Sequence, residues 1–512
     1  MGAPTAPIHR VPDVTLDPRT PVIIGVGQYN HRAKGLDDAL EPVALMERAV
    51  HAAAADAGLD GPPLADSVRV VNVIGWRYRN APRFLAQRLG LDDTAIELAE
   101  STAGGNSPQS LVNATAVEIL DGSLDIAILS GAEAFKTFMR ARKQDVTLDW
   151  SKAADDDLPR YIGKELEMNL PAERDRGLYM PVQIYPMFET ALRAASGRTV
   201  DEHQRFLGEL YAGLSDVAAN NPHAWIQESK TADEITTVTD SNRMIGFPYP
   251  KLMNSNNDVD MGAAIIMCTV EAAERMGVSR DKWVFPHAGT DSHEHPFVSH
   301  RDTFARTPAV ELGAKMALDL AGIAIDDVSV LDLYSCFPSA VQLGAQSLGV
   351  DITPGTGRQW SRTGGLTFCG GPWNNYVMHA IASVVEDLRE RPGEYGFTWA
   401  NGGYATKHAF GVFSTTPPAV AFRHDSPQNE VDALPKRGLA SPADAAGDAT
   451  VEAYSIMFSR DGQPETAQAA CLLADGRRAW GLSTDPAIAA AMCDGEWVGV
   501  GCELDPAGEL LV

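Results

Sequence analysis

The sequence lacks any apolar run long enough to cross a membrane, and its first residues, 1–17, contain no hydrophobic signal core. We therefore expect a cytoplasmic protein with no membrane partner. Cysteine is scarce, and no two of its residues have the Cys-x-x-Cys spacing of a zinc site. Neither a metal nor a disulfide framework is expected from the six cysteines, Cys268, Cys336, Cys369, Cys471, Cys493 and Cys502.

Positive charge is also in deficit, because the formal net charge is -26. This charge opposes bulk attraction to the phosphates of nucleic acids or to anionic membranes. What the sequence does have is an ordinary globular composition, with 45% hydrophobic and 21% charged residues. Its 512 residues exceed what one hydrophobic core usually serves, so two to four domains are predicted.

A strand–helix–strand–helix–strand order occurs twice in the pattern of apolar residues. In each copy the first helix ends at an Ala-Gly pair, Ala57-Gly58 and Ala321-Gly322. The matched order predicts an α/β protein built from two similar halves. The predicted elements are residues 22–27, 42–58, 68–74, 107–120 and 126–130 in the first half, and 283–286, 308–321, 328–333, 373–389 and 396–400 in the second.

Two further regions depart from this repeat. Residues from 135 to about 246 are irregular, with helices predicted at 182–195 and 201–220, and are interpreted as a lid inserted over a ligand site. The polar stretch 424–450 is interpreted as a linker. Four strands around Asp-Gly turns then predict a small antiparallel barrel, at 451–459, 466–473, 479–482 and 497–504. The predicted domains are 1–280 with the insertion 135–246, then 281–425, then 426–512.

Four stretches resemble motifs of one superfamily: GGNSPQSLVNATAVEILDG with LSGAEA, KLMNSNNDVDMGAA, DLYSCFPSA with RTGGLTFCGGPWNNY, and WANGGYATKHAFG. In order and interval they are similar to the thiolases, closest to the sterol carrier protein X branch, over roughly residues 20–422. With the barrel-like tail, the chain resembles the thiolase-like proteins of type 1. The resemblance implies two βαβαβαββ halves layered α/β/α/β/α, a helical loop domain that holds coenzyme A, and a C-terminal domain with an OB-like barrel.

The thiolase nucleophile is absent from its place. A thiolase carries a cysteine where a helix begins, because the helix N-terminus lowers the thiol pKa. The resemblance puts Gly104 and Gly105 at that position, so no acyl-enzyme is expected there. Ser107 lies further into the helix and is interpreted as a capping or packing residue.

The two other catalytic places have also changed. A Gly-His-Pro turn of the thiolases matches Gly370-Gly371-Pro372, and a cysteine before a Gly-Gly turn matches Ala400. A fourth motif, Asn-Glu-Ala-Phe or His-Asp-Cys-Phe in relatives, appears as Tyr334-Ser335-Cys336-Phe337. Tyr334 either donates a hydrogen bond or a proton to a substrate oxygen, or is a buried tyrosine bonded to a backbone carbonyl.

The remaining candidate side chains are thiols, imidazoles and a second phenol. Cys336 and Cys369 are either alternative nucleophiles or, as is more common, small buried hydrophobic residues. His408 follows the Gly-Gly turn and is the better histidine candidate, whereas His379 is interpreted as structural. Tyr376 is a weaker candidate acid or base than Tyr334.

Backbone groups are the last candidates. Glycines permit backbone N–H groups to point into a cleft and hold an anion or oxyanion, although the same glycines also serve in tight turns. The candidate ligand-binding or oxyanion positions are Gly105, Asn106, Gly371, Asn401, Gly402 and Gly403.

Together these residues favour a thiolase-like protein of lipid metabolism that binds acyl-CoA or CoA and needs no other cofactor. It resembles an acetyl-CoA acetyltransferase without the Cys/His/Cys set, so ordinary thiolase activity is not expected. One alternative is a lyase that uses Tyr334 to cleave a β-hydroxyacyl-CoA by retro-aldol chemistry. Another is a non-catalytic binding protein. The sequence leaves both a monomer and a homodimer open.

Overall fold

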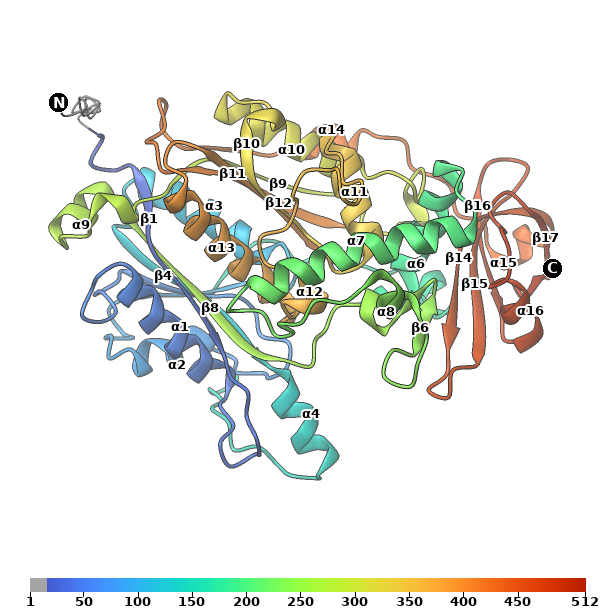
Figure 1. Cartoon of the computed structure of the whole chain (residues 1–512), viewed down its shortest axis with the longest axis horizontal. Helices are drawn as coiled ribbons and strands as arrows, with labels where there is room; N and C mark the ends of the chain where they lie inside the picture. Colours follow the sequence, from blue (N-terminus) through green and yellow to red (C-terminus); the bar gives the residue numbers. More distant parts are fainter. Residues whose placement is uncertain (1–15) are drawn as a thin grey trace, which may run out of the picture.

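The computed structural model describes residues 16–512, whose C-terminal sheet lies at the opposite end of the long axis from the start of β1 (Figure 1). The prediction about a missing signal core falls mostly on residues 1–15, which lie outside the described residues. Within residues 16–512, no helix combines the length and the apolar character needed to cross a membrane. Over the same range, no three His, Cys, Asp or Glu side chains are grouped as metal ligands.

The first sheet has six strands. Strands β2, β3, β4 and β5 run parallel to one another, whereas β8 is antiparallel to both β1 and β4. Helices α1 (Pro42–Asp56) and α2 (Ala81–Arg88) cover one face, and α3 (Ser107–Leu120) covers the other. The spatial order is β1 (Pro21–Asn30), β8 (Asp260–Thr269), β4 (Ile126–Ala134), β2 (Ser67–Val70), β3 (Glu97–Ser101) and β5 (Arg160–Ile162).

The second sheet has five strands, and α10 (Pro308–Ala321) and α11 (Pro338–Leu348) lie on its outer side. Helix α3 and helix α13 (Tyr376–Glu390) contact both sheets and lie between them (Figure 1). The spatial order is β10 (Val328–Leu333), β11 (Tyr395–Gly402), β12 (Lys407–Ser414), β9 (Phe285–His293) and β13 (Arg423–Asp425). The α/β/α/β/α order that the resemblance implies is confirmed.

The double covering explains the apolar runs in the sequence. Each residue from Pro21 to Gln28 of β1 is buried, because helices pack on both faces of the sheet. Close packing also requires glycine: an ideal Cβ at Gly25 would lie only 2.1 Å from the carbonyl oxygen of Ala53 in α1. The motif VIIGVG is therefore a buried strand whose glycines allow helix α1 to pack closely against it.

The third sheet is a small β-barrel made by the C-terminal residues. An isolated β-bridge between Leu482 and Glu509 joins the two ends of the strand order given below. One further strand, β6 (Met244–Phe247), pairs with β14 from the segment that precedes β8. The barrel strands in spatial order are β16 (Arg478–Ser483), β15 (Pro464–Leu472), β14 (Gly447–Phe458), β17 (Gly501–Leu504) and β18 (Leu510–Leu511).

Two long helices of the predicted insertion pack against α11, and one of them also packs against the barrel strand β14, whereas α4 (Phe135–Lys143) lies by the first sheet (Figure 1). The two long helices are α6 (Pro181–Ser196) and α7 (Val200–Asn220), close to the predicted 182–195 and 201–220. The shorter helices of the chain are α4, α5 (Pro171–Arg174), α8 (Ala232–Thr236), α9 (Val270–Arg275), α12 (Gly365–Phe368), α14 (Gln428–Asp432), α15 (Pro442–Ala445) and α16 (Pro486–Ala491).

Several predicted boundaries need correction. The strand predicted at 497–504 begins only at Gly501, because residues 497–500 form a turn closed by the Val500 amide on the Trp497 carbonyl. The stretch 424–450 is not a plain linker, since it contains part of β13, two short helices and the start of β14. The helix predicted at 373–389 begins with a 3-10 turn, Trp373–Asn375. Segment 135–246 is not only a lid, because β5 extends the first sheet.

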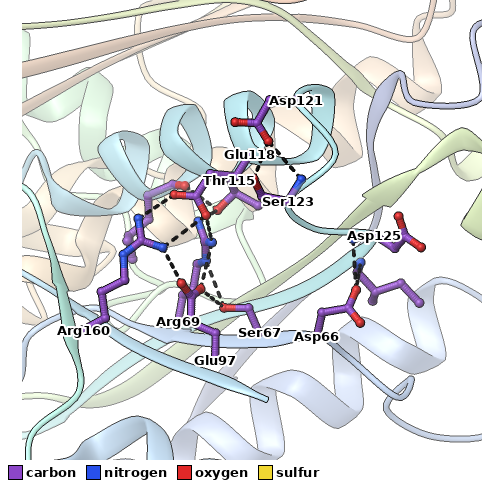
Figure 2. A network of polar contacts seen from close by, with 12 residues as sticks. Asp66, Ser67, Arg69, Glu97, Thr115, Glu118, Asp121, Ser123, Asp125 and Arg160 are labelled. Atoms are coloured by element: carbon purple, nitrogen blue, oxygen red, sulfur yellow. Dashed lines mark hydrogen bonds and ion pairs between the residues drawn. The ribbon is translucent and has the colours of Figure 1, made fainter. Parts of the chain in front are cut away.

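An ion-pair network fastens β5 and β3 to α3 (Figure 2). The buried guanidinium of Arg69 donates to Glu97 at 2.9 Å and also to Glu118. Arg160 of β5 donates to the same two carboxylates, at 2.7 Å in the case of Glu118. Each carboxylate is therefore shared by two arginines, of which only Arg69 is fully buried.

We predict that the Arg69→Met substitution lowers the stability of the chain more than Arg160→Met does. Removing Arg69 leaves two partly buried carboxylates short of donors, at a cost of about 3 kcal/mol. Arg160 is about half exposed, so its loss costs about 1 kcal/mol or less. Differential scanning calorimetry checks the order, with Arg280→Met, whose partner Glu274 is also exposed, as a control that leaves the melting temperature unchanged. Equal losses for Arg69 and Arg160 would contradict the account.

Candidate functional site

The turn from Gly104 to Asn106, between β3 and α3, is where the resemblance to the thiolases predicts the nucleophile position. The Gly104 amide donates to the side-chain oxygen of Asn374 at 3.0 Å, which ties the turn to the second half of the chain. The Ser107 hydroxyl donates to the carbonyl of Thr102 at 2.7 Å. Ser107 thus holds the turn in shape, and its hydroxyl is engaged with the backbone.

Position 105 has no room for a side chain. An ideal Cβ at Gly105 would lie 2.3 Å from the carbonyl oxygen of Asn401 and 2.4 Å from the hydroxyl oxygen of Tyr334. Both distances are far shorter than a carbon atom permits. The glycine is therefore a steric requirement of the tyrosine and the strand that face it, and the volume of the nucleophile side chain is filled.

Tyr334 directly follows β10. Its ring and that of Tyr376 meet edge to face, with 5.6 Å between the ring centroids. Tyr334 is 7% exposed, and burial raises its pKa well above the usual value. The hydroxyl therefore stays protonated at neutral pH, able to donate a hydrogen bond but not to act as a base. Within residues 16–512 the hydroxyl makes no hydrogen bond, whereas that of Tyr376 is shared with Thr363 at 2.5 Å.

The two thiols near the motifs are unsuited to nucleophilic attack. Burial raises the pKa of Cys336 to about 12 and that of Cys369 to about 12. Both thiols are therefore protonated at neutral pH, and Cys369 has no exposed surface. The structure gives no support to Cys336 as a catalytic residue, because burial of its thiol outweighs the hydrogen bonds, including one with Tyr185, that favour the thiolate.

The two histidines are buried and neutral. The indole of Trp399 donates to Nδ1 of His408 at 3.3 Å, and burial lowers the pKa of His408 to about 3. Its ring packs beside Trp399 and Phe410, so it serves the core of the second sheet and not the turn at Gly105. His379 contacts Gln28 at 2.9 Å, and burial lowers its pKa to about 3 as well.

The candidate backbone positions are only partly brought together. Gly105, Asn401 and Gly402 lie against one another, since a Cβ at Gly402 would lie 3.0 Å from the Gly105 nitrogen. The Gly371 amide instead donates to the Asn256 carbonyl at 2.9 Å, so it is not free to hold a ligand. Across residues 16–512, the backbone amides of Gly105 and Asn106 donate no hydrogen bond.

Tyr185 of α6 fills the space beside the Gly-Gly turn, and no local pattern in the sequence pointed to it. Its hydroxyl accepts from Asn401 Nδ2 and from the Ala405 amide, both at 2.9 Å, and donates to the Gly403 carbonyl at 3.2 Å. The ring stacks on Phe337 at 4.6 Å between centroids. A tyrosine from the inserted helices therefore closes this side of the Gly-Gly turn.

Lys407 is a second residue that sequence reasoning missed. It is 8% exposed and begins β12, where every residue is buried. Its ammonium donates to the Ala103 carbonyl, and burial lowers its pKa. A Cβ at Gly104 would lie 3.0 Å from Nζ, so the cation borders the candidate site. A cation in the apolar stretch KHAFGVF was the available signal.

We predict that Gly105→Ala destabilises the chain because its Cβ meets Tyr334 and the Asn401 carbonyl. The double variant Gly105→Ala with Tyr334→Ala removes one of the two collisions and should lose less than the sum of the single losses. Gly213→Ala is the matched control: this glycine of α7 has no atom within 4 Å of an added Cβ, and alanine suits a helix better. Thermal melts measure all four, and strict additivity would contradict the contact.

Residues 427–509 match the family described as the thiolase-like protein type 1 additional C-terminal domain. A monomeric SCP2-thiolase-like protein type 1 from Mycobacterium smegmatis has 32% sequence identity and a TM-score of 0.81, over 96% of this chain and 98% of that one. No curated protein matches the sequence.

Two more distant structures share only the fold. The Ltp2–ChsH2(DUF35) aldolase has 19% identity and a TM-score of 0.58, over 78% of this chain and 98% of that one. Human mitochondrial 3-ketoacyl-CoA thiolase in complex with CoA has 16% identity and a TM-score of 0.54, over the same shares. The duplicated fold, the altered nucleophile turn and the added barrel lead to one conclusion: the chain belongs to the SCP2-thiolase-like protein type 1 family.

Proposed function

We propose that the protein binds CoA thioesters of lipid metabolism without carrying out thiolase chemistry. The observation that carries the second half of this proposal is the filled nucleophile position, where Tyr334 and the Asn401 carbonyl occupy the volume of a side chain at Gly105. No group of the site can then accept an acyl chain, and neither thiolysis nor Claisen condensation can start.

Acyl transfer needs a thiolate, a base and a donor for the oxyanion. The described residues near the turn supply only the donor. The protonated Tyr334 hydroxyl and the amides of Gly105 and Asn106 have unused N–H or O–H groups. Such groups can orient and polarise a thioester oxygen, which is binding and not turnover.

The CoA half of the proposal is supported by the fold that this chain shares with a CoA-bound thiolase. The described residues fit a thioester oxygen through the donors of the turn. They do not fit a covalent acyl group, because Tyr334 and Tyr185 close the turn from both sides. No reaction step through CoA follows from these contacts.

We further propose that the protein acts as a monomer. Strand β3 of the first sheet pairs with β5 of the same chain, and β5 is the strand at the edge of the sheet. A strand of a second copy therefore finds the backbone groups of β3 in use.

A retro-aldol lyase is the second candidate function. The observation in its favour is the Tyr334 hydroxyl, which is 7% exposed as a residue and unpartnered among the described side chains. As a donor it can protonate or bind the oxygen of a leaving carbonyl compound. Its raised pKa argues against Tyr334 itself acting as the base that must remove the hydroxyl proton of a β-hydroxyacyl-CoA.

The test combines calorimetric titration with product analysis. We predict that CoA and acetoacetyl-CoA bind the full chain, that acetoacetyl-CoA is not consumed when CoA is added, and that no ketone or aldehyde forms from a β-hydroxyacyl-CoA. Tyr334→Phe keeps the ring but loses the donor, and should weaken acetoacetyl-CoA binding by about fivefold while leaving CoA itself unchanged.

The other outcomes separate the candidates. Consumption of acetoacetyl-CoA with CoA would overturn the proposal, and release of a ketone or aldehyde that Tyr334→Phe abolishes would favour the lyase. Absence of any CoA binding would leave only the fold in common with the thiolases.

A further inference from the structure

A cavity of about 410 Å³ lies beside the candidate site and has no place in the proposed function. It is bounded by α3, by the segment that follows β5, and by β9, β12 and β13. Its lining includes Asn106 and Lys407 but not Gly105, Tyr334 or Cys336. The cavity is therefore a neighbour of the turn at Gly105 and not the place where a thioester would meet that turn.

The polar lining of the cavity includes the Lys407 ammonium, the Asp291 carboxylate and the imidazoles of His293, His408 and His424. In the register of β9 and β12, Lys407 and Asp291 stand on the same face, the one that α3 covers. Lys407 uses one of its three N–H donors on the Ala103 carbonyl. Within residues 16–512, no carboxylate oxygen lies within 4.0 Å of its Nζ. A cation buried without a counter-ion is costly, by several kcal/mol.

The carboxylates nearest to Lys407 are engaged elsewhere. Asp291 accepts from Ser110, from Asn113 at 3.0 Å and from His424 at 2.8 Å. Glu165 accepts from the Ala103 amide at 3.0 Å. The protein thus builds no partner for this ammonium, although acidic residues outnumber basic ones by 68 to 42.

Part of the cavity lining is apolar. It comprises Leu111 and Ala114 of α3, Ile162 at the end of β5, and Leu166 of the segment after β5. The volume is within the range of ligand pockets and is far larger than a single water site. A ligand that suits both ends has one negative group and a short hydrocarbon chain.

We propose that this cavity binds a small organic carboxylate, with the carboxylate on the Lys407 ammonium and the hydrocarbon chain on Leu111, Ala114 and Ile162. The carboxylate supplies the counter-ion that the chain itself lacks. The N-terminus of α3, which begins at Ser107 beside the same cavity, adds a favourable field for negative charge. This site adjoins the CoA thioester site proposed above and shares Asn106 with it, but it does not include Gly105 or Tyr334.

The experiment titrates the full chain with hexanoate and, in parallel, with its neutral isostere hexanamide, followed by calorimetry. The wild type should bind hexanoate about tenfold or more tightly than hexanamide, the usual gain of a charged hydrogen bond. Lys407→Met keeps the length of the side chain but removes the charge, and should abolish the preference for hexanoate. Lys164→Met, at an exposed position on the rim, is the matched control that keeps it.

A second variant guards against misfolding of the first. Ala114→Leu fills the apolar end and should weaken both ligands without changing the charge. Thermal melts verify that each variant is folded. Equal binding of hexanoate and hexanamide, no binding of either, or a preference that survives Lys407→Met in a folded variant would each overturn the proposal.

Discussion

The contact between Tyr334 and Gly105 is the constraint on which the candidate site depends. The hydroxyl of the tyrosine and the carbonyl of Asn401 leave no volume for a side chain at the start of α3. The glycine at position 105 is therefore not an isolated feature, because Tyr334 and the Asn401 carbonyl occupy the space beside it. A cysteine placed at position 105 alone would collide with both.

The rest of the site is arranged around the same closure. Tyr185 from the inserted helices binds the turn that follows Asn401, and burial keeps Cys336 protonated beside it. His408 faces the core of the second sheet instead of the turn. Lys407 lies beside the same turn and lines a cavity on the α3 side. Within residues 16–512 its ammonium forms no ion pair, and this is the observation from which the carboxylate site is proposed.

The sequence predicted the framework better than the site. Helices 107–120 and 308–321 have the predicted bounds, because proline near their starts and Asp121-Gly122 and Gly322 at their ends mark them locally. The replacement of the thiolase nucleophile by Gly104-Gly105 stays a prediction, since it depends on the resemblance of one motif. Tyr185 and β5 were not predicted, because their roles arise from contacts between segments far apart in the chain, which no local pattern encodes. Lys407 is intermediate: its charge stood out in an apolar strand, but its lack of a counter-ion needed the packing of α3.

Intact-protein mass spectrometry after incubation with a labelled acyl-CoA tests the central claim most directly. The filled position at Gly105 and the protonated buried thiols predict that the mass of the chain stays unchanged, however long the incubation. A mass increase equal to one acyl group, mapped to a peptide that contains Cys336 or Cys369, would contradict the account and show that a thiol of this chain still attacks the thioester.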